Sequence, residues 1–178
     1  GSGKSTAIKI LAGQLVPNLG TDKEASHKAL LEYFKGTEAQ VFFEQLAKGS
    51  VKVSYKPQHI DQIQKNAKGK VKDLLEKVDE TKKLIEVAKA LDIHHILNND
   101  IATVSGGEMQ RIAIAATVLK KANLYVFDEP TSYLDISQRI RVAKFIKELA
   151  NEETAVLVVE HDLIILDFMT DLIHIMFG

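Results

Sequence analysis

The last third of the sequence alternates short, uninterrupted apolar runs with amphipathic segments, and this pattern restricts the fold more than any other feature. The apolar runs are residues 124–127 (LYVF) and 155–159 (AVLVV), and a helical pattern fills residues 136–150 between them. Strands without polar residues are typical of parallel sheets that helices cover on both faces. We therefore expect an α/β fold, with a further short helix over 163–169 and a last strand over 171–177.

The earlier part of the chain predicts more helix than strand. We expect helices over residues 4–12, 71–77, 81–91 and 107–120, helical patches near 30–34 and 41–46, and a strand around 51–55. Gly13 follows the first helix, in the position where a glycine commonly ends a helix. Residues 59–120 lack strong strand patterns, so we expect a helical subdomain there, inserted into a core of residues 1–58 and 121–178.

The composition excludes several classes of protein. The 178 residues carry a net charge of −1 and contain no cysteine. No overall field therefore draws the chain onto nucleic acid or an anionic membrane, and cysteine nucleophiles and thiolate metal sites are excluded within this stretch. Apolar runs such as 155–159 are far shorter than the ~18 residues of a membrane-spanning helix, so we expect no membrane association.

A glycine-rich stretch leads directly into the first predicted helix. It consists of Gly1, Ser2, Gly3, Lys4, Ser5 and Thr6. Glycines ahead of a helix allow backbone N–H groups to curl around a phosphate, and the helix N-terminus adds the positive end of its dipole. Lys4 would then reach the β- and γ-phosphates of a nucleotide, and the Ser5 hydroxyl would bind Mg²⁺. The alternative, on these six residues alone, is a Gly/Ser linker.

Two carboxylates follow the apolar run at 124–127. Asp128 and Glu129 would stand at the carboxyl edge of a parallel sheet, where α/β folds bind their ligands. Asp128 is then a candidate for holding Mg²⁺ through its bound water, and Glu129 for orienting or deprotonating an attacking water molecule. The alternative is an ordinary acidic turn, but the phosphate-loop pattern in the same chain favours a functional pair.

A second helix start, at residues 105–108, reads Ser-Gly-Gly-Glu. Ser105 and Glu108 have the spacing of a capping box, which is sufficient to explain these two residues. Gly106 and Gly107 are not needed for a cap, and glycine lowers helix propensity. Both glycines are explained if the backbone must approach another group closely, such as a phosphate.

Taken in order, these three patterns resemble the Walker A, signature and Walker B motifs of ABC-type ATPase domains. The resemblance covers the whole chain and implies an α/β P-loop NTPase fold of ABC ATPase type, with N-terminal strands lying upstream of Gly1. It adds three residues to the site, because Gln58 resembles the Q-loop glutamine, Asp135 the D-loop aspartate, and His161 the switch histidine. Their structural alternatives are a loop glutamine, a helix N-cap and a strand-end histidine.

The resemblance also implies how these residues divide their roles, because ABC-type domains clasp two ATP molecules head to tail between two domains. The residues implied to act on this chain's own ATP are Lys4, Ser5, Gln58, Asp128, Glu129 and His161. Of these, Gln58, Glu129 and His161 would be catalytic, and Ser5, Gln58 and Asp128 would lie near Mg²⁺. The residues implied to contact the facing domain's ATP are Ser105, Gly106, Gly107, Glu108 and Asp135.

Several stretches most resemble the first nucleotide-binding domain of the RNase L inhibitor family, which is subfamily E of the ABC proteins. They are residues 11–20, 33–38, 104–111, 128–139 and 158–163. Members of that family are soluble, carry two such domains and an N-terminal iron–sulfur domain in one chain, and split ribosomes for recycling after termination. The resemblance implies a cytoplasmic fragment whose iron–sulfur cluster and adenine-stacking residue lie upstream. Its implied partners are a second nucleotide-binding domain, the small ribosomal subunit and termination factors.

Two other functions remain open at this level. A transporter nucleotide-binding domain shares these motifs and would contact membrane helices through the segment after Gln58. A binding module that holds ATP without turnover is a further alternative for the chain on its own, because no facing signature is present. DNA-repair and chromosome-organising ABC ATPases are disfavoured, because the interval between Lys4 and Ser105 is too short for a long coiled coil and contains no cysteine.

Two remaining features are weaker. Residues 52–72 are rich in lysine and could meet rRNA phosphates, but a solvated loop explains them at least as well. The adjacent pair His94 and His95 lacks the spacing of a helical metal-binding pair, so we assign no metal to it.

Overall fold

A computed structural model of the chain describes residues 4–22, 24–60, 62 and 66–173. The chain divides into two compact units, residues 1–53 with 176–178 and residues 54–175. The predicted division into an ATP-binding core and a helical subdomain over about 59–120 stays a prediction.

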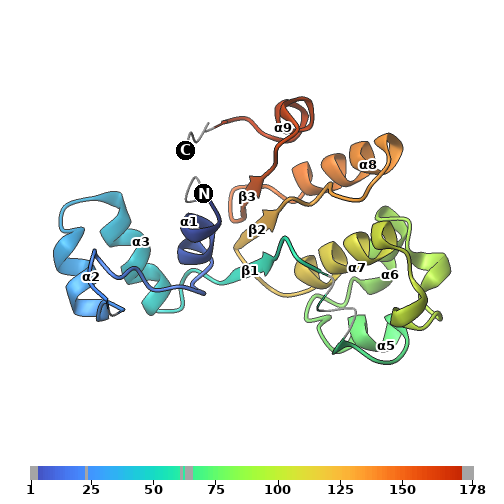
Figure 1. Ribbon diagram of the computed structural model, residues 1–178, viewed down its shortest axis with the longest axis horizontal. Coiled ribbons are helices and arrows are strands. Elements are labelled where there is room, and N and C mark those ends of the chain that lie inside the picture. Colours follow the sequence, from blue (N-terminus) through green and yellow to red (C-terminus); the bar gives the residue numbers. More distant parts are fainter. Residues whose placement is uncertain (1–3, 23, 61, 63–65, 174–178) are drawn as a thin grey trace. The chain divides into compact units, whose positions relative to one another are not determined.

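A parallel pair of strands lies at the centre of the larger unit. β2 (Leu124–Asp128) and β3 (Ala155–Val159) pair in register, so that Asp128 stands opposite Val159. β1 (Val53–Lys56) lies next to β2, which gives the sheet order β1-β2-β3 (Figure 1). The two apolar runs therefore form neighbouring parallel strands, as their composition predicts.

Helices make up most of the rest of this unit. They are α5 (Val71–Glu76), α6 (Leu84–Ala90), α7 (Gly106–Val118), α8 (Ile136–Lys147) and α9 (Leu163–Met169), with 3₁₀ turns at His94–Ile96 and Ile101–Thr103. Each helix overlaps a segment that the sequence predicts to be helical; α7 starts one residue earlier than expected and α6 three residues later. Its start is set by the Asp79 carboxylate, which accepts the backbone amides of Lys83 and Leu84 at 3.2 and 3.0 Å.

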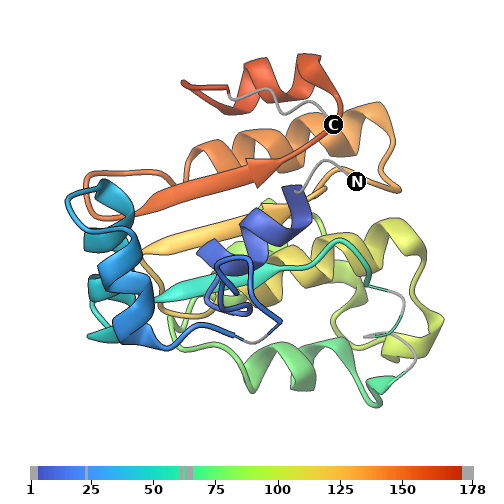
Figure 2. The same cartoon turned by 60° about the vertical axis from the view of Figure 1, so that its left-hand side comes forward.

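One face of the sheet forms the core of this unit. Tyr125 and Phe127 alternate with Val126 along β2 and join Val156 and Val158 of β3 in one apolar cluster. Residues of α5, α6, α7 and α8 complete the cluster, and Figure 2 shows α8 running alongside β3 with α9 packed against it. Because this packing fixes β2 and β3, it also fixes the residues that follow them.

The smaller unit is helical. It contains α1 (Lys4–Leu11), α2 (His27–Tyr33) and α3 (Glu38–Ala47). The Ser26 hydroxyl caps α2 by accepting the Ala29 amide at 3.2 Å, and the rings of Phe34 and Phe43 lie 5.5 Å apart. After α1 the chain turns at Gly13, whose φ of +67° suits glycine, which agrees with the predicted helix end.

The predicted last strand over 171–177 lies mostly outside the described residues. Residues 171–173 are described and form no strand. No helix in the described part of the chain is long and apolar enough to cross a membrane.

Candidate functional site

The carboxyl ends of β2 and β3 lie at one edge of the sheet, and each strand runs into a pair of polar residues. β2 ends at Asp128 and continues into Glu129, while β3 ends at Val159 and continues into Glu160 and His161. The Glu129 amide donates a hydrogen bond to the Val159 carbonyl at 2.8 Å, which extends the pairing beyond β2. The parallel register thus brings both polar pairs to the edge where α/β sheets bind ligands.

The Glu129 carboxylate is the centre of this group. Its Oε1 accepts a hydrogen bond from Gln58 Nε2 at 2.7 Å and lies 2.9 Å from His161 Nε2. Its Oε2 accepts a hydrogen bond from Ser132 Oγ at 3.2 Å. Glu129 is largely buried, with 17% of its side chain exposed, whereas His161 is 62% exposed. The structure therefore brings three predicted site residues together around a shielded carboxylate with an open imidazole beside it.

Two buried side chains hold the backbone of this turn. Glu129 has a φ of +46°, a conformation that side-chain-bearing residues rarely adopt without support. Lys56 Nζ donates to the carbonyls of Asp128 and Glu129 at 2.9 and 3.2 Å, and Gln110 Nε2 donates to the Glu129 carbonyl at 2.7 Å. Both Lys56 and Gln110 are fully buried. Sequence reasoning did not select either residue, because a lysine in a short strand normally suggests an exposed position.

The charges at this edge are unbalanced. Burial lowers the pKa of Lys56 to about 8, although the negative charges of Asp128, Glu129 and Glu160 oppose the shift. Burial also raises the pKa of the Asp128 carboxyl; the nearby Glu129 charge adds to this rise, and a hydrogen bond from Tyr55 opposes it. Burial thus favours the neutral forms of both Lys56 and Asp128, and a cation beside Asp128 would stabilise its ionised carboxylate.

Mg²⁺ fits this set of groups. It prefers hard oxygen ligands and retains several of its waters, and Asp128 offers a buried carboxylate at the sheet edge. Gln58 uses its Nε2 for Glu129, which leaves its amide oxygen as the atom that could bind a cation or its water. Asp128 Oδ2 also accepts the Tyr55 hydroxyl at 3.3 Å, a contact that the sequence did not predict.

Glu160 joins the two strand ends. Its Oε2 accepts hydrogen bonds from the Thr131 hydroxyl at 2.6 Å and the Thr131 amide at 3.3 Å, and its Oε1 accepts the His161 amide at 2.9 Å. The turn after β2 and the turn after β3 therefore share one carboxylate. Sequence reasoning missed this residue, although its position directly before His161 was the available signal.

The Ser-Gly-Gly-Glu segment forms the N-terminus of α7 with a complete capping box. Ser105 Oγ accepts the Glu108 amide at 3.3 Å, and Glu108 Oε2 accepts the Ser105 amide at 2.7 Å and the Ser105 hydroxyl at 2.8 Å. These hydrogen bonds from Ser105 lower the pKa of Glu108. A Cβ added to Gly107 would meet the Tyr133 carbonyl at 3.1 Å, whereas one added to Gly106 would meet nothing closer than 3.9 Å. A side chain at Gly107 would therefore crowd the turn at Tyr133, which gives this glycine a packing role independent of any phosphate.

The remaining predicted residues lie at helix starts. Asp135 is the N-cap of α8, with its Oδ1 accepting the Gln138 amide at 2.8 Å, which agrees with its structural alternative and leaves its bridging role a prediction. α1 begins at Lys4, so Ser5 and Thr6 lie in its first turn. The side chains of Lys4 and Ser5 are not described. The predicted phosphate-contacting residues 1–3 lie outside the described residues.

The fold and the site together define the class as the ATP-binding domain of an ABC protein, whose Walker B, Q-loop, switch and signature motifs the sequence resembles. The sequence model of the ABC transporter family matches residues 1–132, and the chain belongs to this family.

Individual relatives and solved structures show which members of the ABC family the chain is similar to. The chain is 51% identical, over 179 aligned residues, to an uncharacterised ABC transporter ATP-binding protein of Methanocaldococcus jannaschii, covering 100% of this chain and 29% of the relative. A solved structure of an RNase-L inhibitor matches with 53% identity and a TM-score of 0.89, over 95% of this chain and 33% of that one. An archaeal ribosome recycling factor, solved in complex with a ribosomal stalk protein, matches with the same identity and TM-score over 95% of this chain and 32% of that one.

These comparisons confirm the predicted α/β ABC ATPase fold and the resemblance to the RNase L inhibitor family. The chain spans less than a third of the length of the curated relative and about a third of each solved chain.

Gly107→Ala should destabilise the chain by about 1–3 kcal/mol, because the new Cβ is forced against the Tyr133 carbonyl. Gly106→Ala is the matched control and should be neutral or stabilising by less than about 1 kcal/mol, because its Cβ makes only ordinary van der Waals contact with Tyr133 and alanine favours helix. Urea unfolding of both variants measures the difference. Equal midpoints for the two variants would contradict the packing role of Gly107.

Lys56 should make stability depend on pH in the alkaline range. Between its folded pKa of about 8 and its ordinary 10.5, the unfolded chain holds the lysine proton and the folded chain releases it. Raising the pH through this window therefore increases the free energy of unfolding, by an amount on the order of 1–3 kcal/mol.

Lys56→Met removes the titrating amine, so the difference in unfolding free energy between native and variant chains should grow from pH 8 to 10. Parallel curves for the two chains would refute the assignment. The comparison stops at pH 10. Burial raises the pKa of Tyr55 from 10.0 to about 12, so above pH 10 this tyrosine makes the free energy of unfolding fall as the pH rises.

Proposed function

We propose that this chain is the ATP-binding and ATP-hydrolysing domain of a cytoplasmic twin ATPase that splits ribosomes into subunits for recycling. One observation carries the hydrolytic part of this proposal: the Glu129 carboxylate lies within 2.9 Å of both Gln58 Nε2 and His161 Nε2. The likeness to an RNase-L inhibitor and to an archaeal ribosome recycling factor supports the ribosomal part.

Glu129 acts as the general base in this proposal. Its Oε1 is occupied by Gln58 and His161, so the attacking water must approach Oε2, where the Ser132 hydroxyl is the longest of the three contacts at 3.2 Å. A water that displaces this hydroxyl donates one proton to Glu129, which is shielded enough from solvent for proton transfer to be effective. Gln58 then keeps the carboxylate in position, because it still donates to Oε1 after His161 has turned to the γ-phosphate.

The other residues bind and orient the nucleotide. Lys4 and the N-terminus of α1 would bind the β- and γ-phosphates, and Ser5, Gln58 and Asp128 would hold Mg²⁺, which would neutralise phosphate charge. His161, which is mostly exposed, turns from Glu129 to contact the γ-phosphate. Catalysis of this kind depends mainly on positioning and on stabilising developing charge.

The facing domain completes the site. Ser105, Gly106, Gly107 and Glu108 contact the partner's ATP, and Asp135 lies between the two sites. We propose that this second domain belongs to the same parent chain, together with an upstream iron–sulfur domain; a chain without cysteine is compatible with a cluster bound elsewhere. Closure on ATP and opening after hydrolysis would supply the mechanical step.

Glu129→Gln tests the hydrolytic proposal in a protein that contains both ATP-binding domains. The amide cannot accept a proton, so the hydrolysis rate at this site should fall at least about 100-fold while ATP binding is retained. Single-turnover hydrolysis and equilibrium nucleotide binding are measured together. Glu153→Gln, in the exposed turn before β3, is the matched control and should hydrolyse normally. Unchanged hydrolysis in Glu129→Gln would remove Glu129 from the mechanism.

Co-sedimentation tests the ribosomal proposal. The Glu129→Gln parent protein, loaded with ATP and Mg²⁺, is sedimented through sucrose with ribosomal subunits, and separately with a membrane fraction. ATP-dependent migration with the small subunit is the expected result. Recovery with membranes and absence from ribosomes would favour a transporter domain. ATP binding without turnover in the native two-domain protein would favour a nucleotide-gated binding module.

A further inference from the structure

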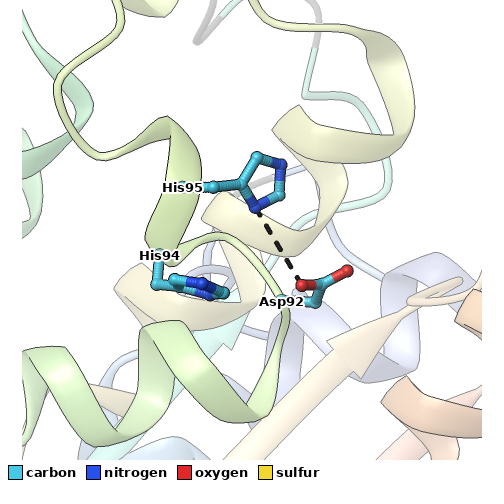
Figure 3. Close-up of side chains that lie close together, drawn as sticks. All are labelled: Asp92, His94 and His95. Atoms are coloured by element: carbon cyan, nitrogen blue, oxygen red, sulfur yellow. Dashed lines mark ion pairs between the residues drawn. The ribbon is translucent and has the colours of Figure 1, made fainter.

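The turn after α6 gathers three side chains of the types that bind metal ions. Asp92, His94 and His95 each offer one ligand atom, and these atoms all lie within 4.8 Å of one another (Figure 3). Asp92 Oδ1 and His95 Nδ1 are 4.0 Å apart, and the two imidazole centroids are 5.6 Å apart. None of these residues takes part in the proposed ATP site.

The backbone beneath these side chains is fixed by burial. Leu91 and Ile93 are fully buried, and Ile96 is 4% exposed, so the chain is held on both sides of the turn while His94 and His95 are exposed. Asp92 has a φ of +54°, which places its side chain differently from a helical residue. This explains why helical spacing gave no reason to assign a metal here.

Arg111 anchors the same turn from α7. Its side chain is 5% exposed, and its NH1 group donates to the carbonyls of Leu91 and Asp92 at 3.1 and 2.9 Å. The same NH1 group lies 3.6 Å from Asp92 Oδ2, so the guanidinium orients the carboxylate and leaves Oδ1 toward His95. A ligand carboxylate held by a second partner in this way is typical of metal sites.

The charges and distances are compatible with a cation. Asp92 and the nearby Glu108, whose charge interacts with that of His95, outnumber the single positive charge of Arg111. Two ligand atoms of a tetrahedral zinc ion lie about 3.4 Å apart. The ligand atoms here would therefore have to move about 1 Å closer together, which rotation of the exposed side chains allows. Two imidazoles and one carboxylate suit zinc, nickel, cobalt or copper rather than Mg²⁺ or Ca²⁺, which prefer oxygen ligands.

We propose that Asp92, His94 and His95 form a surface site for one divalent transition-metal ion of the zinc class. Three protein ligands leave at least one coordination position for water or for a donor from another molecule. Mg²⁺ should not compete for this site, because it prefers oxygen ligands to imidazole.

The test is a titration of the metal-free full chain with Zn²⁺, and with Co²⁺ as a spectroscopic probe, at neutral pH in excess Mg²⁺. We expect saturable binding that is weakened at least about tenfold in His94→Gln, His95→Gln and Asp92→Asn. Asparagine is chosen because it tolerates the left-handed backbone at position 92. Bound Co²⁺ should show the visible absorption of nitrogen ligation, and this signal should be lost in the histidine variants.

His27→Gln is the matched control, because His27 is an exposed histidine on α2 and should leave metal binding unchanged. Thermal unfolding gives a second measurement: Zn²⁺ should raise the Tm of the native chain and not that of the His94→Gln, His95→Gln double variant. The metal-free chains should unfold at similar temperatures, because the changed side chains are exposed. No saturable binding, or equal binding by the double variant, would overturn the proposal.

Discussion

The hydrogen bond from the Glu129 amide to the Val159 carbonyl is the interaction on which the rest of the site depends. It continues the β2–β3 pairing beyond the last residue of β2, and the polar residues after the two strands therefore meet. The backbone turns sharply at Glu129, and the buried side chains of Lys56 and Gln110 stabilise that turn by donating hydrogen bonds to the Glu129 carbonyl. The main chain of Glu129 is thus fixed on both sides of its carboxylate, by its own amide and by the donors to its carbonyl.

The sequence was most informative where one physical requirement dominated. Continuous apolar runs predicted β2 and β3, and Ser105 and Asp135 form the helix caps that their positions suggested. The alternation of apolar residues around β1 predicted a strand but not which of its faces is buried, because the buried side chains are the polar ones, Ser54 and Lys56. Their partners are carbonyl groups, at Thr117 for Ser54 and at the turn after β2 for Lys56, and such partners become visible only when the chain is folded.

The same limit explains the other residues that the sequence did not reveal. Glu160 has no motif of its own and gains a role only because Thr131 lies beside it. Gly107 suggested a close approach, and the structure shows that the approaching group is the Tyr133 carbonyl. The adjacent pair His94 and His95 does not follow helical spacing, and a left-handed residue at Asp92 followed by a 3₁₀ turn brings the three side chains together. Contacts across turns depend on tertiary packing, which spacing rules for regular helices do not represent.

The capping box at α7 has a consequence for any contact between Ser105 and a phosphate. The Ser105 hydroxyl already donates its only proton to the Glu108 carboxylate, whose lowered pKa keeps it ionised. A phosphate that is to receive this proton must compete with an anion of the same sign at the same atom. In the chain as described, the Ser105 proton is therefore held by Glu108, and a phosphate receives it only when the hydrogen bond to Glu108 is exchanged for one to the phosphate.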